Sequence, residues 1–195
     1  MRTAAVILAA GKSSRMGKNK LLLKVEGRTV LDRLFDAILS SKVEDTIIVL
    51  GYIPEAIKPI ADARNVRSVI NSQHERGMTS SFQTGLKAVD TDAVFLILGD
   101  QLGLTSELLD LMIDCMKSDP EALIVSPEYE CKRGHPSLFK ASLFNEILNL
   151  PKDEHMKYVV TRHEEQHRNV PGSIWNILDF DTPEDFQRAL NLLSA

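Results

Sequence analysis

Short runs of apolar residues alternate with helical patterns over the first two-thirds of the chain. Each run is brief and mostly apolar, which is typical of parallel strands covered on both faces. Five runs are predicted to be strands, at residues 4–8, 46–50, 66–70, 93–98 and 122–126. Four segments between them are predicted to be helices, at residues 31–40, 54–63, 80–89 and 106–117. The last has an apolar stripe and two plausible N-caps, Thr105 and Ser106. The stripe consists of Leu108, Leu111, Met112 and Cys115. This alternation predicts an α/β fold: a three-layer sandwich around a mostly parallel, Rossmann-like sheet with right-handed crossovers.

The pattern changes after about residue 127. Residues 137–140 favour a further strand and residues 141–150 a helix, whereas residues 151–176 are polar and predicted to be irregular. A closing helix is predicted at 183–193, where Pro183 takes a tolerated first-turn position. With 195 residues, the chain fits one domain spanning residues 1–195.

Composition narrows the classes of function. Apolar residues make up 44% of the chain, enough for a core, and the net charge of -4 predicts no basic face for nucleic acid. Two cysteines, Cys115 and Cys131, cannot form a disulfide framework and suggest a reducing compartment. No apolar run approaches the roughly 20 residues that cross a bilayer, so we expect a cytoplasmic protein without a membrane partner. The apolar run at 4–10 is at the lower limit for a signal peptide and leads straight into a glycine turn, which favours a buried strand.

The turn after the first predicted strand carries the clearest candidate chemistry. Ligands of such sheets bind beyond the carboxyl ends of the strands, and here the sequence is LAAGKSSRMGKNKLL, residues 8–22. Small residues let a ligand approach the backbone, turn amides can cradle phosphate oxygens, and Arg15 and Lys20 can neutralise a triphosphate. It is not a Walker A loop, because the earlier glycine position holds Val6, and no G-x-G-x-x-G is present. The alternative is a solvated basic loop that binds nothing.

Asp100 follows the predicted strand at 93–98 and should emerge at the same edge of the sheet. A carboxylate in that position is a natural ligand for Mg²⁺, which takes one or two carboxylates together with phosphate oxygens. The alternative is an aspartate that caps the following turn.

Together these segments resemble the MobA-like nucleotidyltransferase family, and most closely its molybdenum cofactor cytidylyltransferase branch. The likeness covers nearly the full length. The matching segments are LAAGKSSRMG at 8–17 with Lys20, GMTSS at 77–81, LGDQ at 98–101, RGHP at 133–136 and DFDTPED at 179–185.

The resemblance implies a fold of the nucleotide-diphospho-sugar transferase type and a reaction. The terminal phosphate of molybdopterin attacks the α-phosphorus of CTP, and pyrophosphate leaves. Catalysis then consists of positioning and charge neutralisation. By resemblance, Arg15, Lys20 and Asp100 are the catalytic residues, and Asp100 and Asp181 hold Mg²⁺, with Asp179 the alternative to Asp181 as the second ligand.

The resemblance also implies two sets of binding residues. Base and nucleotide contacts are expected from Leu8, Ala9, Ala10, Gly11, Ser80 and Ser81, with the turn backbone at Ala9, Ala10 and Gly11, together with Ser81, reading the base. Alanine rather than glycine at position 10 favours CTP over GTP. Residues 127–176 are expected to form the acceptor side, with Arg133 and His135 as ligands of the acceptor; the alternative for His135 is a loop histidine bonded to backbone.

Two departures leave the acceptor open. Leu102 stands where the family often has proline, and PKDEH at 151–155 replaces a usual Gly-Asp-x-Gly stretch. Transfer to a sugar phosphate or another phosphorylated acceptor is one alternative, and a non-catalytic chaperone that delivers cofactor to a client molybdoenzyme is another.

One further motif imitates a metal site. Residues 163–167 match the zinc-protease pattern H-E-x-x-H, which requires a long, half-buried helix and a third ligand. Pro171 interrupts four residues later, so a solvated helical turn is expected.

Overall fold

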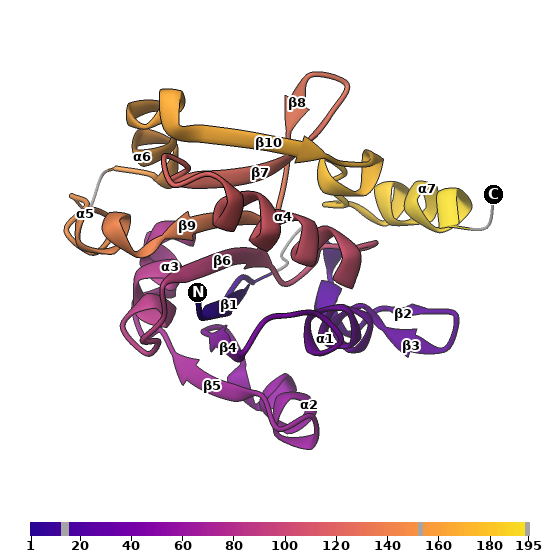
Figure 1. Ribbon diagram of the computed structural model, residues 1–195. Helices are drawn as coiled ribbons and strands as arrows, with labels where there is room; N and C mark the ends of the chain where they lie inside the picture. The colour runs from indigo at the N-terminus through magenta and orange to yellow at the C-terminus, as the bar shows by residue number, and fades with distance from the viewer. Residues whose placement is uncertain (13–15, 152–153, 194–195) are drawn as a thin grey trace.

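The computed structural model describes residues 1–12, 16–151 and 154–193 (Figure 1). Within them, eight strands form one sheet in the order β10-β7-β9-β6-β1-β4-β5, with β8 paired to β7 outside this path. The strands are β1 (Thr3–Ala9), β4 (Asp45–Leu50), β5 (Arg67–Ile70), β6 (Ala93–Leu98), β7 (Ile124–Tyr129), β8 (Lys132–Arg133), β9 (Ser137–Lys140) and β10 (His167–Pro171). A separate hairpin joins β2 (Lys24–Val25) to β3 (Arg28–Thr29).

Seven α-helices lie within the described ranges. They are α1 (Val30–Leu39), α2 (Lys58–Ala63), α3 (Met78–Leu86), α4 (Ser106–Ser118), α5 (Phe144–Leu148), α6 (Met156–Arg162) and α7 (Pro183–Leu193). The predicted strand at 137–140 and the closing helix at 183–193 are confirmed with these bounds.

The centre of the sheet is parallel. β1 lies between β4 and β6 and pairs in parallel with both, and β4 pairs in parallel with β5. β9 is antiparallel to both β6 and β7, whereas β10 returns parallel to β7. The predicted mostly parallel α/β class is therefore confirmed, and the carboxyl ends of β1, β4, β5 and β6 meet at one edge.

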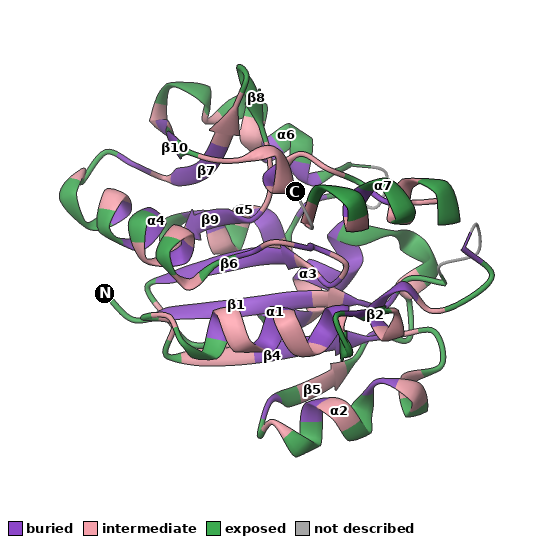
Figure 2. Ribbon diagram, turned by 90° about the vertical axis from the view of Figure 1, so that its right-hand side faces the viewer, coloured by how far each residue is buried: buried purple, intermediate pink, exposed green. Residues whose placement is uncertain are grey.

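Helices cover both faces of the sheet, as the three-layer prediction requires (Figures 1 and 2). Apolar residues of α1, α2 and α4 bury against one face, whereas α3, α5 and α6 bury against the other. Successive residues of β1 alternate between the two clusters: Ala5 and Ile7 join the first, and Ala4 and Val6 the second. Because both faces are covered, β1 reads as a continuous apolar run in the sequence.

A smaller apolar cluster closes the end of the molecule near the carboxyl ends of the strands. It joins the β2–β3 hairpin to the segment before α7 through Val25, Val30, Leu102 and Phe180. Trp175 packs against it. This cluster places the segment before α7 beside the turn that follows β6.

The prediction that residues 151–176 are irregular is wrong. α6 and β10 lie there, and α6 buries Met156 and Val159 and half-buries Val160, whereas its other residues are exposed. β10 has little apolar character, with the sequence HRNVP, and is a strand because it pairs with β7. Such pairing along an edge is a tertiary contact that periodicity alone does not report.

Two helices also differ from expectation. The helix predicted at 54–63 is split into a 3-10 turn (Pro54–Ala56) and α2, with Pro59 in the first turn of α2, where proline is tolerated. In α4, Thr105 caps the helix as expected by accepting the N–H of Leu108 at 3.2 Å. Leu111, expected on the buried stripe, is 44% exposed, because α4 turns Leu109 and Ile113 inward.

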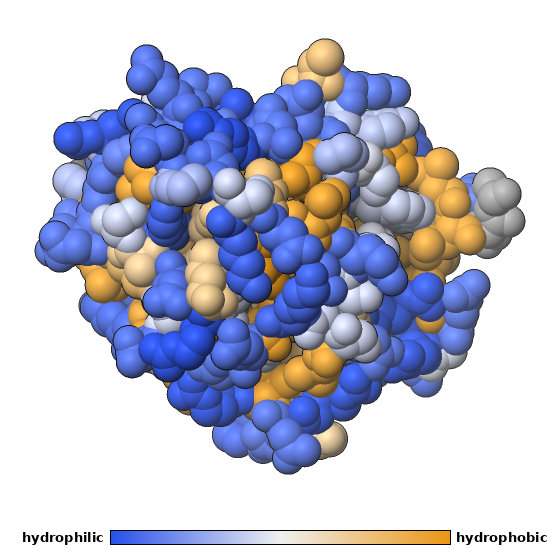
Figure 3. All heavy atoms as spheres, in the orientation of Figure 1, coloured by the Kyte–Doolittle hydropathy of each residue, from blue (hydrophilic) through white to orange (hydrophobic). Residues whose placement is uncertain are grey.

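The surface fits the mildly acidic composition. In the view of Figure 3, hydrophilic residues cover most of the molecule, with apolar residues showing in the middle and around α7. Among the described residues, no helix combines the length and apolar character that crossing a membrane requires.

Candidate active site

Lys20 stands at the centre of the candidate site. It begins a short 3-10 turn (Lys20–Leu22), which Asn19 caps by accepting the N–H of Leu21 at 3.0 Å. Its side chain is 10% exposed and reaches Asp100 Oδ2 at 3.2 Å and Asp181 Oδ1 in a shorter contact. The two carboxylates come from the turn after β6 and the segment before α7, so the fold joins three predicted residues from distant parts of the chain.

Electrostatics keep Lys20 charged. Burial by itself would lower the pKa of the Lys20 ammonium, but the hydrogen bonds and charges of Asp181 and Asp100 outweigh burial and raise the pKa above its ordinary value. The ammonium also lies 5.6 Å from the centre of the Phe180 ring, which is buried beneath it.

The same two carboxylates fit the donor set of Mg²⁺. Asp100 and Asp181 converge on one cation, and both side chains are about a third exposed, at 35% and 36%. Mg²⁺ takes one or two carboxylates plus substrate phosphates rather than a complete protein cage. The described residues contain no group of three or more His, Cys, Asp and Glu side chains that could hold a metal.

A cavity of about 360 Å³ opens beside these carboxylates, and we call it the first cavity. Of the predicted residues, it is lined by Leu8, Ala10, Gly11, Ser81, Asp100 and Asp181. A Cβ added at Gly11 would meet no atom within 4 Å, so the turn leaves open space in front of its backbone. Arg15, the remaining predicted catalytic residue, lies outside the described residues.

One predicted nucleotide contact, the Ser80 side chain, faces elsewhere. Ala9 is expected to contact the nucleotide through its backbone, and its side chain is buried in the core cluster under α1 and α4. Ser80 donates to the carbonyl of Gln73 at 3.1 Å and accepts from Asn71 Nδ2 at 2.9 Å. Asn71 also donates to Ser81 Oγ, at 3.1 Å. Ser80 thus holds the loop before α3, and Ser81 is the serine that reaches the first cavity.

A second cavity, of about 570 Å³, lies on the face of the sheet that carries α3 and α6. Met78 lines both cavities. A gap of about 20 Å³ shares Asp100 with the first cavity and His135 with the second. Arg133 and His135 both line the second cavity, so the fold brings the predicted acceptor residues next to the predicted metal ligands.

His135 is held by its main chain. Its N–H donates to the carbonyl of Asn176 at 2.8 Å, and its own carbonyl accepts from Gln101 Nε2 and Asn176 Nδ2. The ring Nδ1 is buried with no hydrogen-bond partner among the described residues. Burial lowers the pKa of the imidazole below its ordinary value, although the charges of Asp179 and Asp100 oppose the shift. The ring is therefore neutral at pH 7. The main-chain hydrogen bonds, and not the ring, hold the loop.

Gly134 and Arg133 precede His135 in the same loop. A Cβ at Gly134 would lie 2.1 Å from the carbonyl oxygen of Asn176, so only glycine fits there. Arg133 is exposed and is bound on the protein surface, to Asn169 Oδ1 and Glu164 Oε2, each at 2.8 Å. An acceptor that used Arg133 would have to share it with Glu164.

The zinc-like motif is not a metal site. α6 ends at Arg162, and His167 begins β10, so the two histidines do not share one helix face. His163 Nε2 contacts Glu146 at 2.8 Å, whereas His167 Nε2 contacts Ser126 at 3.0 Å. The expected solvated helical turn applies to residues 164–166, but His167 is buried.

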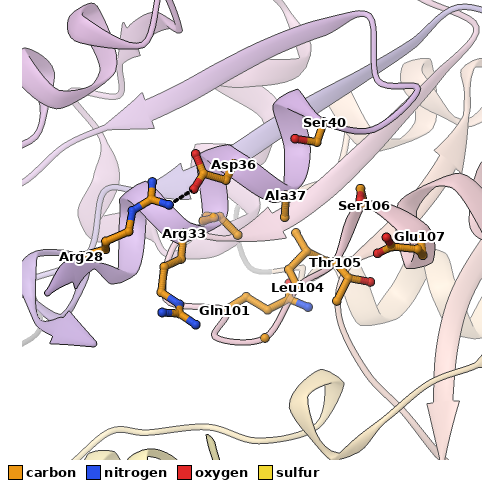
Figure 4. A pocket seen from close by; sticks show the side chains of 12 residues that line it. Arg28, Arg33, Asp36, Ala37, Ser40, Gln101, Leu104, Thr105, Ser106 and Glu107 are labelled. Atoms are coloured by element: carbon orange, nitrogen blue, oxygen red, sulfur yellow. Dashed lines mark ion pairs between the residues drawn. The ribbon is translucent and has the colours of Figure 1, made fainter. Parts of the chain in front are cut away.

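A third cavity, of about 490 Å³, lies between α1 and the start of α4 (Figure 4). Its arginines are already in ion pairs, Arg28 with Asp36 and Arg33 with Glu26. Gln101 lines it too, but none of the predicted site residues does. The candidate site is therefore the pair formed by the first and second cavities.

The sequence profile of the MobA-like NTP transferase domain matches residues 5–168. The chain belongs to this family. Its match begins in β1 and ends in β10, so it includes the turn with Lys20, Asp100 and the loop of His135. The chain is thus a nucleotidyltransferase, as the resemblance implied.

The names of curated relatives of this chain indicate several different substrates. The molybdenum cofactor cytidylyltransferase of Escherichia coli (strain K12) is 29% identical over 93% of this chain and 92% of that protein. A probable molybdenum cofactor guanylyltransferase of Natranaerobius thermophilus is 27% identical over 97% and 96%. A nicotine blue oxidoreductase of Paenarthrobacter nicotinovorans is 30% identical over 71% of each chain. Family membership by itself therefore does not fix the substrates.

A solved structure of similar sequence confirms the type of fold. Rv0371c from Mycobacterium tuberculosis H37Rv is 29% identical, with a TM-score of 0.84 over 98% of each chain. A second structure of that protein, in complex with manganese, has a TM-score of 0.80 at 26% identity. The predicted nucleotide-diphospho-sugar transferase fold is confirmed.

Sequence reasoning missed several residues that build the MobA-like site here. Gln101 and Asn176 hold the loop of His135, and Ser126, Ser137 and His167 line the second cavity. Gln101 lay within a quoted motif and could have been singled out. The others carry no local signal, because their positions depend on how β7, β9 and β10 pair.

Proposed function

We propose that this nucleotidyltransferase moves CMP from CTP to the terminal phosphate of a molybdopterin-type acceptor and releases pyrophosphate. The observation that carries the proposal is the cluster of Lys20, Asp100 and Asp181 beside the first cavity, which adjoins the second cavity at Met78. Transfer between two bound molecules needs two such spaces that meet at the reacting phosphorus.

The first cavity suits the donor. Gly11 leaves room for phosphates at the turn, and the Lys20 ammonium supplies positive charge to the triphosphate and to the leaving pyrophosphate. Mg²⁺, held by Asp100, Asp181 and phosphate oxygens, would neutralise charge on the reacting phosphates.

The second cavity suits the acceptor. An acceptor phosphate oxygen forms a bond to the α-phosphorus while the bond to the bridging oxygen of pyrophosphate breaks, and the two oxygens must lie roughly in line. An acceptor in the second cavity would approach past Met78, which lines both cavities, and His135, which shares a gap with Asp100. The neutral His135 ring, with Nδ1 unpartnered, is placed to hydrogen-bond an acceptor there.

Ala10 supports CTP as the donor. It lines the first cavity, and its Cβ packs closely against the backbone of Gly51, where an added Cβ would lie 2.7 Å from it. In the resemblance, glycine at this position marks the GTP-using branch, so alanine here favours CTP.

The cavity lining disfavours a sugar phosphate as acceptor. Five apolar side chains line the second cavity: Met78, Leu96, Phe139, Met156 and Val160. A sugar would leave hydroxyl groups unpaired against these apolar side chains, which costs free energy. The faces of a flat ring carry no hydroxyl groups and would not have this cost.

Pyrophosphate release tests the proposal. The protein is incubated with Mg²⁺ and each of the four ribonucleoside triphosphates, alone, with molybdopterin, and with a sugar 1-phosphate. We expect release with CTP and molybdopterin together, and its loss in Asp100→Asn. Equal or faster pyrophosphate release with GTP in place of CTP would contradict the proposal. So would release when the sugar 1-phosphate, and not molybdopterin, is the acceptor that supports it. A chaperone without turnover would bind both molecules and release no pyrophosphate.

A further inference from the structure

Three buried polar side chains form a chain of hydrogen bonds in the wall of the second cavity. His167 Nε2 lies 3.0 Å from Ser126 Oγ, and Ser126 Oγ lies 3.0 Å from Ser137 Oγ. The residues come from β10, β7 and β9, and their exposed fractions are 7%, 1% and 9%. Nothing in the proposed chemistry of Lys20, Asp100 and Asp181 uses them.

The hydrogen bonds from His167 through Ser126 to Ser137 have a preferred donor-to-acceptor direction. Burial lowers the pKa of His167 to about 4, so its ring is neutral at pH 7 and carries one proton. Nδ1 is buried without a partner among the described residues. A buried N–H without an acceptor is rarer than an acceptor without a donor, which favours the proton on Nε2. Nε2 then donates to Ser126, Ser126 donates to Ser137, and the hydroxyl proton of Ser137 is left for another acceptor.

The surroundings of Ser137 indicate what that acceptor is. Apolar side chains, including Phe139 from the same strand and Met156 from α6, line the cavity around the chain. Exposed basic residues, His155 and Lys157, line it as well. A flat ring could pack its faces on the apolar side chains and accept the Ser137 hydrogen bond at a nitrogen or carbonyl on its edge. Negative charge elsewhere on the same molecule would suit the basic residues.

We propose that the chain of His167, Ser126 and Ser137 selects the acceptor of this enzyme by donating a hydrogen bond from Ser137 to the edge of a nitrogen heterocycle. The inference rests on the proposed function for the place of the acceptor, and it assigns a new role to these three residues. Ser137 contacts the ring. Ser126 and His167 are positioning residues that orient its hydroxyl group.

Binding of a simple fluorescent pterin, 6-hydroxymethylpterin, separates this inference from the turnover reaction. We expect Ser137→Ala to raise the Kd of the pterin roughly three- to tenfold, the effect of one neutral hydrogen bond. His167→Leu should weaken binding similarly. His167→Gln should restore it, because the glutamine amide can donate in place of Nε2. The KM for CTP should stay unchanged in all three variants.

The matched control is Ser41→Ala. Ser41 donates to the carbonyl of Ile38 at 2.7 Å just after α1, away from both cavities, and its loss should leave pterin binding unchanged. Wild-type protein that does not bind the pterin would overturn both the acceptor class and this inference. Wild-type binding with an unchanged Kd in Ser137→Ala would overturn the inference alone. Parallel losses of pterin and CTP binding would reduce the chain to a structural role and also overturn it.

Discussion

Lys20 occupies the point at which the two predicted metal ligands converge, so its removal should strengthen metal binding by the nucleotide-free protein. A divalent cation that binds Asp100 and Asp181 must displace the ammonium from both carboxylates. Because both carboxylates are about a third exposed, each pair contributes only about 0.5–1 kcal/mol net. Removing the two pairs should therefore make metal binding tighter by about 1–2 kcal/mol, or roughly five- to thirtyfold.

The assay is a titration with Mn²⁺ followed by electron paramagnetic resonance of the free ion, at fixed ionic strength because salt screens such pairs. Lys20→Met is compared with wild type and with Lys18→Met, which removes an exposed lysine from the same loop. The same Lys20 variant should lose at least about a hundredfold in turnover, since one aimed electrostatic group contributes that much. Unchanged or weaker Mn²⁺ binding in Lys20→Met, with the fold intact, would refute the reasoning.

Four further results are expected. Asp100→Asn should lower kcat at least about a hundredfold in saturating Mg²⁺ with little change in the melting temperature, because Asp100 lies outside the core; near-normal turnover would remove Asp100 from the mechanism. His135→Asn should raise the KM for the acceptor and not that for CTP, because the main chain holds the loop; steady-state kinetics would show a shared effect if the ring were structural. Gly134→Ala should lower the free energy of unfolding in urea by about 1–3 kcal/mol, because its Cβ would lie 2.1 Å from the Asn176 carbonyl. The pKa of His167 is about 4 in the folded protein, whereas the histidine of the unfolded chain is protonated below about pH 6.5, so the free energy of unfolding should fall by roughly 3 kcal/mol as the pH is lowered from 6.5 to 4. In urea titrations, His167→Gln should flatten this dependence of stability on pH, and an unchanged dependence would contradict the assignment.

Local signals in the sequence were sufficient for much of the fold. β1, β4 and β6 were predicted to within a residue or two at each end, because a strand covered on both faces must be apolar throughout. The cap at Thr105 was predicted from its hydroxyl group and its spacing to Leu108. The turn at Gly11 and the carboxylate at Asp100 were placed at one sheet edge by the rule for parallel strands.

The closing half of the molecule was less predictable. Met156 and Val159 are only two buried positions among polar neighbours, too few for a clear helical stripe. His167 reads as part of a solvated, zinc-like motif and is buried because β10 pairs with β7. In α4, the expected stripe was out of phase because packing against the sheet, and not the local pattern, sets the rotation of a helix with apolar residues on several sides.

The sequence by itself determined which residues are candidates for the chemistry: Lys20 and Asp100 by residue type and place after a strand, and Asp181 by the family resemblance. Only the tertiary structure decided that one ammonium joins two carboxylates 80 and 161 residues away in the chain. It alone joined Ser126, Ser137 and His167 into one hydrogen-bonded chain. The physical reason is that residue type and spacing report local conformation and chemistry. Distances between remote side chains depend on strand order and burial, which the whole core sets together.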